Sequence, residues 1–310
     1  MGKGATRLRG EELEIHDGPS GQYVLVNGMH LRLAPPFMMD VDWVGNSKAV
    51  SRLYACWYVQ RNGDHPMSPR LVGKPGVGKT VLAYSVGKKL NKPVYFFQAT
   101  SDTNPNDVLI TPIVIETGKD SSVVQYIASA LVTAMLVGGI CVFDEGNRMQ
   151  EKAWASLAPL LDSRRYVDCN NVGLVIDAHK DFRFVATMND DASCFELPDY
   201  IKSRLQPQIQ IENPTRVEER GILEVNLKNA DPVVLDYVAD FLDLARRNDE
   251  EYSIRDGIHV ANYADKLIHY EAFCGRDLDP GEAVVDAVEQ IIGIRQARYI
   301  KQILWQERAA

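Results

Sequence analysis

The sequence predicts an α/β fold: a five-stranded parallel sheet between two layers of helices, followed by an all-helical domain. Between residues 41 and 212, short β-rich runs alternate with stretches of helical period, which is the pattern of a parallel sheet covered on both faces. Beyond residue 213 only helical patterns remain. The Asn213-Pro214 pair separates the two parts, because a residue before proline disfavours helical backbone.

Each predicted strand is a short run rich in apolar and β-branched residues. The strands are expected over 70–73, 94–97, 140–143, 182–187 and 209–211. Helical spacing is found over 80–90 and 123–137. The apolar run 127–143 approaches the length of a membrane span, but a glycine pair interrupts it and two acids follow. It therefore predicts a buried helix that turns into a buried strand.

Three segments follow from these patterns. Residues 1–40 are glycine-rich and charged, then weakly alternating, and end at a proline pair, which indicates an N-terminal arm or small hairpin. Residues 41–212 are the predicted sheet domain, and residues 213–310 are the predicted helical domain. In the helical domain Asp231 and Asp279 each precede a proline, so both are predicted helix N-caps.

Composition excludes several classes of protein. Of the 310 residues 45% are hydrophobic and 25% are charged, which excludes disordered and collagen-like chains. A net charge of −8 gives no global electrostatic reason to bind nucleic acid. The five cysteines are scattered, with no C-x-x-C pair, so we expect a cytoplasmic protein in a reducing compartment, without a zinc site and without a membrane anchor.

The strongest motif is a phosphate-binding loop. It reads Gly73-Lys74-Pro75-Gly76-Val77-Gly78-Lys79-Thr80 and matches G-x-x-x-x-G-K-[ST] between a predicted strand and a predicted helix. Glycines let several main-chain N–H groups turn toward phosphate oxygens at a helix N-terminus. Lys79 would contact the β and γ phosphates, and the Thr80 hydroxyl would ligate Mg²⁺. ATP and Mg²⁺ are therefore the predicted cofactors.

Two acids end a buried strand downstream of this loop. Asp144 and Glu145 follow the apolar run 140–143, and such a position is costly unless a cation is bound there. We predict that Asp144 shares the Mg²⁺ shell with Thr80. Glu145 would polarise the water that attacks the γ phosphate.

Three further polar residues are candidates for the same site. Asn189 stands at the end of the strand predicted over 182–187, and its amide can donate and accept at once beside that water. Arg204 precedes the last strand. Arg255 follows Ser253, a plausible N-cap, at a helix start that disfavours a cation, which suggests a phosphate partner. By spacing alone, either arginine could equally form a surface ion pair.

Together these motifs resemble the AAA+ ATPases, and more narrowly the MoxR branch with its relatives CbbQ, NorQ, GvpN and CobS. The resemblance covers about residues 41–295 and is carried by GKPGVGKT, ICVFDEGNRM, FRFVATMN, LPDYIKSRL and SIR. It implies that Lys79 and Thr80 are Walker A residues, Asp144 and Glu145 Walker B residues, and Asn189 sensor 1. It also implies an arginine finger at Arg204, sensor 2 at Arg255, and adenine packing by residues 41–45, including Val44 and Gly45.

The same resemblance implies a homo-oligomer, usually a hexameric ring, because the finger enters the neighbouring subunit. Two predicted hairpins, over 112–125 and 166–176, correspond to the family's helix-2 and pre-sensor-1 insertions, which face the ring's pore. Gly146 departs from the apolar residue common after the Walker B acids and could loosen the loop that follows. Arg148 is either an interface arginine or the partner of an acid in its own subunit.

Three functions compete on these observations. The first is a ring-forming Mg²⁺-dependent ATPase that remodels or activates a client protein, which in the resembled branch often bears a von Willebrand factor A domain. The second is a nucleic-acid motor of the McrB kind, which is not favoured because the predicted hairpins place acids beside their few cations. The third is a nucleotide-gated scaffold, against which the intact Glu145 argues.

Overall fold

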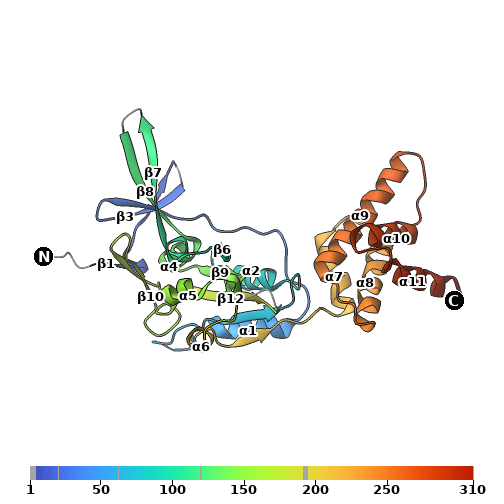
Figure 1. The fold of residues 1–310 in the computed structure, drawn as a ribbon, viewed down its shortest axis with the longest axis horizontal. Coiled ribbons are helices and arrows are strands. Elements are labelled where there is room, and N and C mark those ends of the chain that lie inside the picture. Colours follow the sequence, from blue (N-terminus) through green and yellow to red (C-terminus); the bar gives the residue numbers. More distant parts are fainter. Residues whose placement is uncertain (1–4, 20, 62, 119–120, 191–194, 310) are drawn as a thin grey trace. The chain divides into compact units, whose positions relative to one another are not determined.

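The computed structural model describes the chain except residues 1–4, 20, 62, 119–120, 191–194 and 310, and except the side chains of 116–123 and 307–309. The chain divides into two compact units (Figure 1). The sheet unit comprises residues 1–40, 48–73 and 79–210, and the helical unit comprises residues 41–47, 74–78 and 211–310. The division thus groups residues 1–40 with the sheet. It groups two short segments from the region predicted as the sheet domain, 41–47 and 74–78, with the helices.

The central sheet of the sheet unit is five-stranded and parallel, as predicted. Its strand order is β13-β5-β12-β9-β6, and every neighbouring pair is parallel. The strands are β5 (Arg70–Gly73), β6 (Val94–Gln98), β9 (Ile140–Asp144), β12 (Arg183–Asn189) and β13 (Gln208–Gln210). Each overlaps a run predicted as strand, so the predicted fold class is confirmed.

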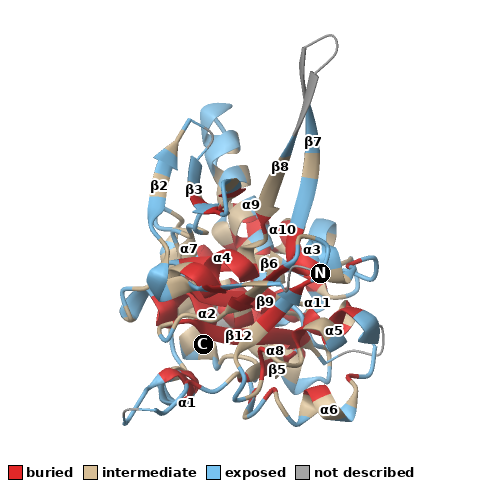
Figure 2. Ribbon diagram, turned by 90° about the vertical axis from the view of Figure 1, so that its left-hand side faces the viewer, coloured by how far each residue is buried: buried red, intermediate tan, exposed pale blue. Residues whose placement is uncertain are grey.

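Helices pack on both faces of this sheet, and its central strands are coloured mostly as buried (Figure 2). The helices are α1 (Ser47–Trp57), α2 (Lys79–Lys89), α3 (Pro105–Val108), α4 (Ala130–Val137), α5 (Glu151–Leu157) and α6 (Asp199–Lys202). On β9, Cys141 and Phe143 belong to the same apolar cluster as α4 and α5. On the opposite face α2 approaches so closely that a Cβ on Gly87 would lie 3.0 Å from Ile140. The result is the three-layer arrangement that a parallel sheet requires.

The helix predicted over 123–137 is wrong in its first six residues. Strand β8 (Ser121–Ala128) occupies them, and α4 begins only at Ala130. Ser129 ends the strand and caps the helix, since its hydroxyl accepts from the Val132 N–H at 3.1 Å. Valine and isoleucine at 123, 124 and 127 favour the paired strand over the helix, which overrides the helical spacing of their apolar positions.

Strands from the N-terminal region join both hairpins of the sheet unit. The described strands outside the central sheet are β1 (Thr6–Arg9), β2 (Ile15–Gly18), β3 (Gly21–Val26), β4 (Met29–Arg32), β7 (Ile110–Gly118), β8, β10 (Tyr166–Cys169) and β11 (Leu174–Asp177). A short 3₁₀ turn, Gly10–Glu12, follows β1, and another, Gly146–Arg148, follows β9. Both predicted hairpins are present, as β7–β8 and β10–β11.

Residues 1–40, predicted as an arm or small hairpin, also pair with strands of both later hairpins. Strand β4 pairs in parallel with β8, which gives a five-stranded outer sheet in the order β2-β3-β4-β8-β7. Strand β1 pairs in parallel with β11 in a separate three-stranded sheet. The β7–β8 hairpin extends well beyond the strands that flank it (Figures 1 and 2).

The helical unit consists of α7 (Arg216–Asn226), α8 (Pro232–Arg247), α9 (Ile254–Phe273), α10 (Pro280–Ile291) and α11 (Ala297–Ala309). The predicted N-caps are confirmed: Asp231 accepts from Val233 N–H, Asp279 from Glu282 N–H and Ser253 from Asp256 N–H. A separate apolar cluster fills this unit, so it has a hydrophobic core of its own.

A buried ion pair lies inside that core. Glu219 of α7 is fully buried, and its Oε1 accepts a hydrogen bond from the Arg246 guanidinium of α8. Its Oε2 has no hydrogen-bond partner among the described residues. Burial raises the pKa of the Glu219 carboxyl to about 7, which Arg246 only partly offsets. The unfolded chain, by contrast, exposes this carboxyl to water.

This pair predicts a pH-dependent stability for the helical unit. Because the folded-state pKa of Glu219 is raised, folding favours its protonated form, and that stabilisation is lost as the pH rises from the unfolded value toward about 7. A Glu219→Gln variant cannot titrate there. As the pH rises from 4.5 to 8, the unfolding free energy of the variant minus that of the parent should therefore increase by up to about 3 kcal/mol. Thermal unfolding of the full chain across this range measures the shift.

The exposed Glu224 on the same helix provides the control. It pairs with Arg220 at 3.4 Å on the surface, so Glu224→Gln should change stability by less than about 1 kcal/mol at every pH. A difference between Glu219→Gln and the parent that stays constant from pH 4.5 to pH 8 would contradict the assignment.

Candidate functional site

Polar residues line the carboxyl edge of the central sheet. In the ladder between β6 and β9, Gln98 is opposite Asp144, and between β12 and β5, Asn189 is opposite Gly73. Because the strands are parallel, their carboxyl ends meet at one edge, which is where α/β sheets bind ligands. The register alone therefore brings residues from four separate stretches of sequence into one row.

Lys79 lies at the centre of this row although it is only 7% exposed. Its ammonium donates to the Gly73 carbonyl at 2.8 Å and to Asn189 Oδ1 at 2.9 Å. A buried lysine needs such acceptors, because an unpaired buried charge is costly. Two of its acceptors are thus a main-chain carbonyl and an amide oxygen, and both are neutral.

Asp144 is held by two hydroxyls. Thr80 donates to Asp144 Oδ1 at 2.8 Å, and Thr187 of β12 donates to the same oxygen. Thr187 also accepts from the Glu145 N–H at 3.2 Å, so one hydroxyl fixes both acids of the predicted pair. The predicted closeness of Thr80 and Asp144 is thus present in the structure.

Glu145 is held by side chains from three segments. Its Oε1 accepts from the Asn189 amide at 3.1 Å, and its Oε2 accepts from Gln98 at 3.1 Å. The Arg148 Nε lies 2.8 Å from Oε2 as an ion pair, although its N–H is not aligned for a hydrogen bond. Glu145 also has a φ of 52°, a left-handed conformation that costs free energy in a residue with a side chain.

Asn189 connects the lysine and the acid. Its Oδ1 accepts from Lys79 while its Nδ2 donates to Glu145. The main chain of Asn189 is held in turn by Asn147, whose Nδ2 donates to the Asn189 carbonyl at 2.8 Å. The dual capacity of an amide, which made Asn189 a candidate from its position in the sequence, is used by both of its polar atoms.

Gly146 is explained by packing against a tryptophan. A Cβ at this position would lie 2.9 Å from the Trp154 ring, and the Trp154 Nε1 donates to the Gly146 carbonyl at 3.1 Å. Gly146 is buried, and the Trp154 indole packs directly against it. A larger apolar residue at position 146 would collide with the indole.

Arg204 contacts Asp162 and Tyr200 of the same chain. Its Nε lies 3.3 Å from Asp162 Oδ2, and its Nη1 donates to the Tyr200 carbonyl at 2.6 Å. Arg164 donates to the same carboxylate through Nε at 3.0 Å and Nη2 at 2.8 Å. The arginine-finger candidate is therefore one of two guanidinium groups that share Asp162.

The remaining loop residues belong to the helical unit. Gly76 and Gly78 have φ angles of 83° and 89°, which only glycine adopts readily. A Cβ on Gly76 would lie 2.6 Å from Ser253 and 3.5 Å from the Arg255 Cβ. Arg255, the sensor 2 candidate, is exposed and begins α9 beside this loop. Pro75 is exposed and Val77 is buried.

The segment predicted to pack on adenine lies against α7. Trp43 is so close to Gly78 that a Cβ there would lie 3.0 Å from its ring, and Val44 lies 3.2 Å from where a Cβ on Gly221 would be. Gly45 has a φ of 76°, and the next N–H, of Asn46, donates to Glu218 at 2.6 Å. This segment is thus fixed at the start of α7 by a carboxylate that also caps the helix.

The chemistry of these groups fits a magnesium nucleotide. Mg²⁺ prefers oxygen ligands and is commonly bound through one or two carboxylates with substrate phosphates and waters, and Asp144 and the Thr80 hydroxyl offer such oxygens. Lys79 supplies a buried cation within hydrogen-bond reach of Asn189. Among the residues that the structure describes, no group of three His, Cys, Asp or Glu side chains is arranged to hold a metal ion.

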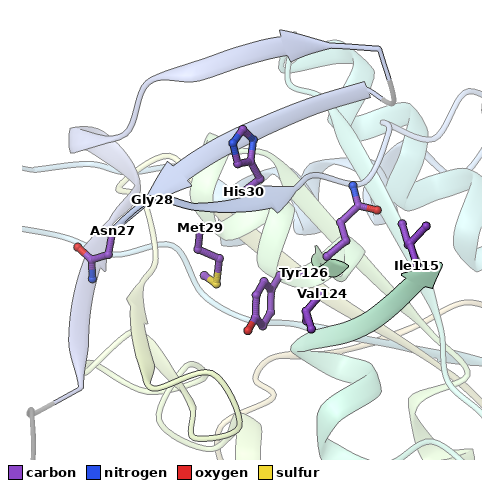
Figure 3. Close-up of a pocket in the computed structure, with 8 residues that line it drawn as sticks. Asn27, Gly28, Met29, His30, Ile115, Val124 and Tyr126 are labelled. Atoms are coloured by element: carbon purple, nitrogen blue, oxygen red, sulfur yellow. The ribbon is translucent and has the colours of Figure 1, made fainter. Parts of the chain in front are cut away.

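A hollow of about 650 Å³ lies elsewhere, on the outer sheet (Figure 3). Its lining comes from the β3–β4 turn and from β4, β7 and β8, and consists of Asn27, Gly28, Met29, His30, Ile115, Val124, Gln125 and Tyr126. No lysine or arginine is among them, so this hollow lacks the permanent charge that a triphosphate requires.

A family profile describes the part of the chain that carries these residues. The AAA domain of the dynein-related subfamily matches residues 70–205. Protein CbbQ of Hydrogenophilus thermoluteolus is 28% identical over 119 residues, which are 38% of this chain and 43% of that protein. Protein NorQ of Paracoccus denitrificans is 29% identical over 119 residues, which are 38% and 42% of the two chains. Residues 70–205 are therefore similar to the AAA domains of the MoxR-like relatives.

Two further comparisons agree with this similarity. The denitrification regulatory protein NirQ of Pseudomonas aeruginosa is 27% identical over 130 residues, 42% of this chain and 48% of that protein. The matches thus span less than half the length of these curated relatives. The Thermotoga maritima RuvB Holliday junction branch migration motor shares the fold, with a TM-score of 0.53 and 16% identity over 79% of this chain and 69% of that one. Within the part of the chain that the structure describes, no helix is long and apolar enough to cross a membrane.

Sequence reasoning missed three residues of the site. The first two are Gln98, which follows a predicted strand, and Thr187, which ends one. The third is Asp162, which lies before the predicted hairpin 166–176. A signal was present for the first two, because each is a polar residue in or at the end of an apolar strand. For Asp162 there was none, because its contact with Arg204 depends on the path of the chain.

The Thr187 hydroxyl should be important for stability. Thr187 is 1% exposed, and replacing it with the isosteric valine removes a donor to Asp144 and leaves the Glu145 N–H without its acceptor. We expect Thr187→Val to lower the unfolding free energy by about 1–3 kcal/mol. Urea unfolding followed by tryptophan fluorescence measures this, since Trp57 and Trp154 are buried in the sheet unit.

Thr187→Ser is the matched control. It keeps the hydroxyl and removes only a methyl group, so it should lose about 1 kcal/mol or less. Equal losses in the two variants would show that packing rather than hydrogen bonding is responsible.

Proposed function

We propose that this protein is a Mg²⁺-dependent ATP hydrolase that forms a homo-oligomeric ring and uses nucleotide turnover to remodel or activate a client protein in the cytoplasm. The observation that carries the proposal is the connected set Lys79, Asn189 and Glu145, together with Thr80 and Asp144 at the same sheet edge. The match of residues 70–205 to an AAA domain supports the same conclusion. A nucleotide-gated scaffold would not need an acid held beside the lysine in this way.

Each residue has a role that follows from its contacts. Lys79 would pair with the β and γ phosphates, and the main-chain N–H groups of residues 73–80 would contact phosphate oxygens. Thr80 and Asp144 would hold Mg²⁺, which supplies charge neutralisation when bound. Glu145 would accept the proton of the attacking water, and Asn189 would orient that water by exchanging its bonds to Lys79 and Glu145 for bonds to the reactants.

In the conformation described here, three side chains engage the Glu145 carboxylate. Gln98, Asn189 and Arg148 all approach its carboxylate. An attacking water would have to displace one of these contacts before it could hydrogen-bond to the carboxylate. We propose that nucleotide or a neighbouring subunit releases these contacts. The ion pair also favours one of the two roles left open for Arg148, a partner of an acid within its own chain.

Substituting the proposed base should separate binding from turnover. Glu145→Gln keeps the size and polarity of the side chain, so ATP affinity should stay within about threefold while kcat falls by about 100-fold or more. Lys79→Ala should instead lose ATP binding. Nucleotide titration by fluorescence and phosphate release measure the two quantities. A Glu145→Gln variant with parental turnover would remove Glu145 from this role.

The client can be sought with the same variant. A ring that binds ATP without hydrolysing it should retain its client, so we expect Glu145→Gln in ATP to capture a defined protein that Lys79→Ala does not. The family resemblance makes a von Willebrand factor A domain the first candidate. Mass spectrometry of the captured material, after nuclease treatment, identifies it. Recovery of nucleic acid alone, with an affinity that falls steeply with salt, would favour the motor function instead.

The charges of the hairpins agree with a protein client. In β11 the Asp177 carboxylate pairs with Arg7, and Asp168 of β10 is exposed. Lys119 and Asp120, at the tip of the other predicted insertion, lie outside the described residues. No basic stripe therefore runs along the described strands of the β10–β11 hairpin, whereas a DNA-tracking surface requires one.

A further inference from the structure

Two arginines of the sheet unit converge on one carboxylate. Arg164 binds Asp162 with both Nε and Nη2, at 3.0 and 2.8 Å, while the Arg204 Nε lies 3.3 Å from the same Oδ2 atom that Nη2 contacts. Two guanidinium groups on a single anionic oxygen are the arrangement that proteins use to grip phosphate. Here an aspartate oxygen occupies the place of the anion.

The turn that carries Asp162 is itself rigid. Its Oδ1 accepts from the Arg164 main-chain N–H at 3.0 Å, so the carboxylate is fixed by the backbone of the residue whose side chain it binds. The hydrogen bond from Arg164 holds the pKa of Asp162 well below its usual range. The next residue, Arg165, is half-buried and donates to the His179 and Phe182 carbonyls, which anchors the turn. The carboxylate therefore stays charged and in place.

The cluster carries an excess of positive charge and is open to solvent. Two cations share one anion, and the other contact of Arg204 is a neutral carbonyl, that of Tyr200. The Arg164 side chain is 52% exposed and that of Arg204 is 28% exposed. An incoming anion can therefore bind the guanidinium group of Arg164, of Arg204 or of both. If it binds only one, the other remains as the counter-ion of Asp162.

We propose that Arg164 is a second arginine that acts in trans, which together with Arg204 contacts the triphosphate held by a neighbouring subunit, and that Asp162 is the positioning residue that keeps the two side chains together. The inference rests on the proposed ring-forming ATPase. It adds Arg164, which no sequence motif indicated, to the predicted arginine finger Arg204. In this structure the Asp162 carboxylate binds the two guanidinium groups that would contact the phosphate.

Mixed oligomers test this directly. Arg164→Ala alone should lower kcat by about 10- to 100-fold, with a change in the KM for ATP of less than about threefold. Such subunits keep their own Glu145 and lack only the arginine offered to a neighbour. Mixed in equal amounts with Glu145→Gln subunits, which are inactive but offer an intact Arg164, they should recover about a quarter of the parental rate, the fraction of interfaces with the productive order. Asp162→Asn should be rescued in the same mixture.

The controls separate the possible outcomes. Glu145→Gln subunits that also carry Arg164→Ala should give no recovery, because they offer no arginine. Arg7→Ala removes a similar exposed arginine, which pairs with Asp177 through two bonds of 2.7 Å and stacks on the same Tyr166 ring, and should keep parental kcat. If Arg164→Ala does not fold, Arg164→Lys keeps the charge without the planar fork and enters the same mixing experiment.

Three results would overturn the proposal. These are parental kcat in Arg164→Ala, no recovery in its mixture with Glu145→Gln, and equal recovery with the doubly substituted subunits. Failure of the underlying function looks different. In that case the parental chain shows no turnover, or stays monomeric in saturating ATP at full activity, before Arg164 is changed.

Discussion

The parallel register of β5, β12, β9 and β6 is the constraint on which the site depends. Asn189 is opposite Gly73 and Gln98 is opposite Asp144 because the ladders place them there. A shift of one residue in any of these strands would turn its side chains to the other face of the sheet. Apolar residues that alternate between two helical layers fix the register, so the packing of the core determines the geometry of the polar edge.

The polar edge balances its charges locally. Lys79 is held by a carbonyl and an amide, Asp144 by two hydroxyls, and Glu145 by two amides and an arginine. Because the Gly73 carbonyl, the Asn189 amide and the two hydroxyls on Asp144 are neutral, a charged ligand can replace these contacts at a lower cost than it could replace an ion pair.

Much of this arrangement could be predicted from the sequence. The glycine-rich loop, the acids after β9 and the asparagine after β12 are marked by residue types that are costly or strained unless they bind something. The helix starts at Asp231 and Asp279 follow from local capping chemistry.

What could not be predicted depends on contacts between distant parts of the chain. The pairing of β4 with β8 has no local signal, and it went unpredicted although both strands alternate weakly. Arg204 was assigned from spacing, but its bond to Asp162 requires the turn before β10 to fold back toward α6. The start of α4 was misplaced because the residues at 123–127 fit two periods, and only the tertiary partner β7 decides between them.

The pairing of β1 with β11 has a consequence for how the chain is made. Thr6 lies opposite Leu174, and Leu31 lies opposite Tyr126, so β1 and β4 leave the ribosome well before the strands β11 and β8 with which they pair. Until then their strand edges are open, which is the condition under which nascent chains associate wrongly. Glu11, Glu12 and Glu14 lie between β1 and β2, and their like charges would keep neighbouring nascent chains apart during this wait.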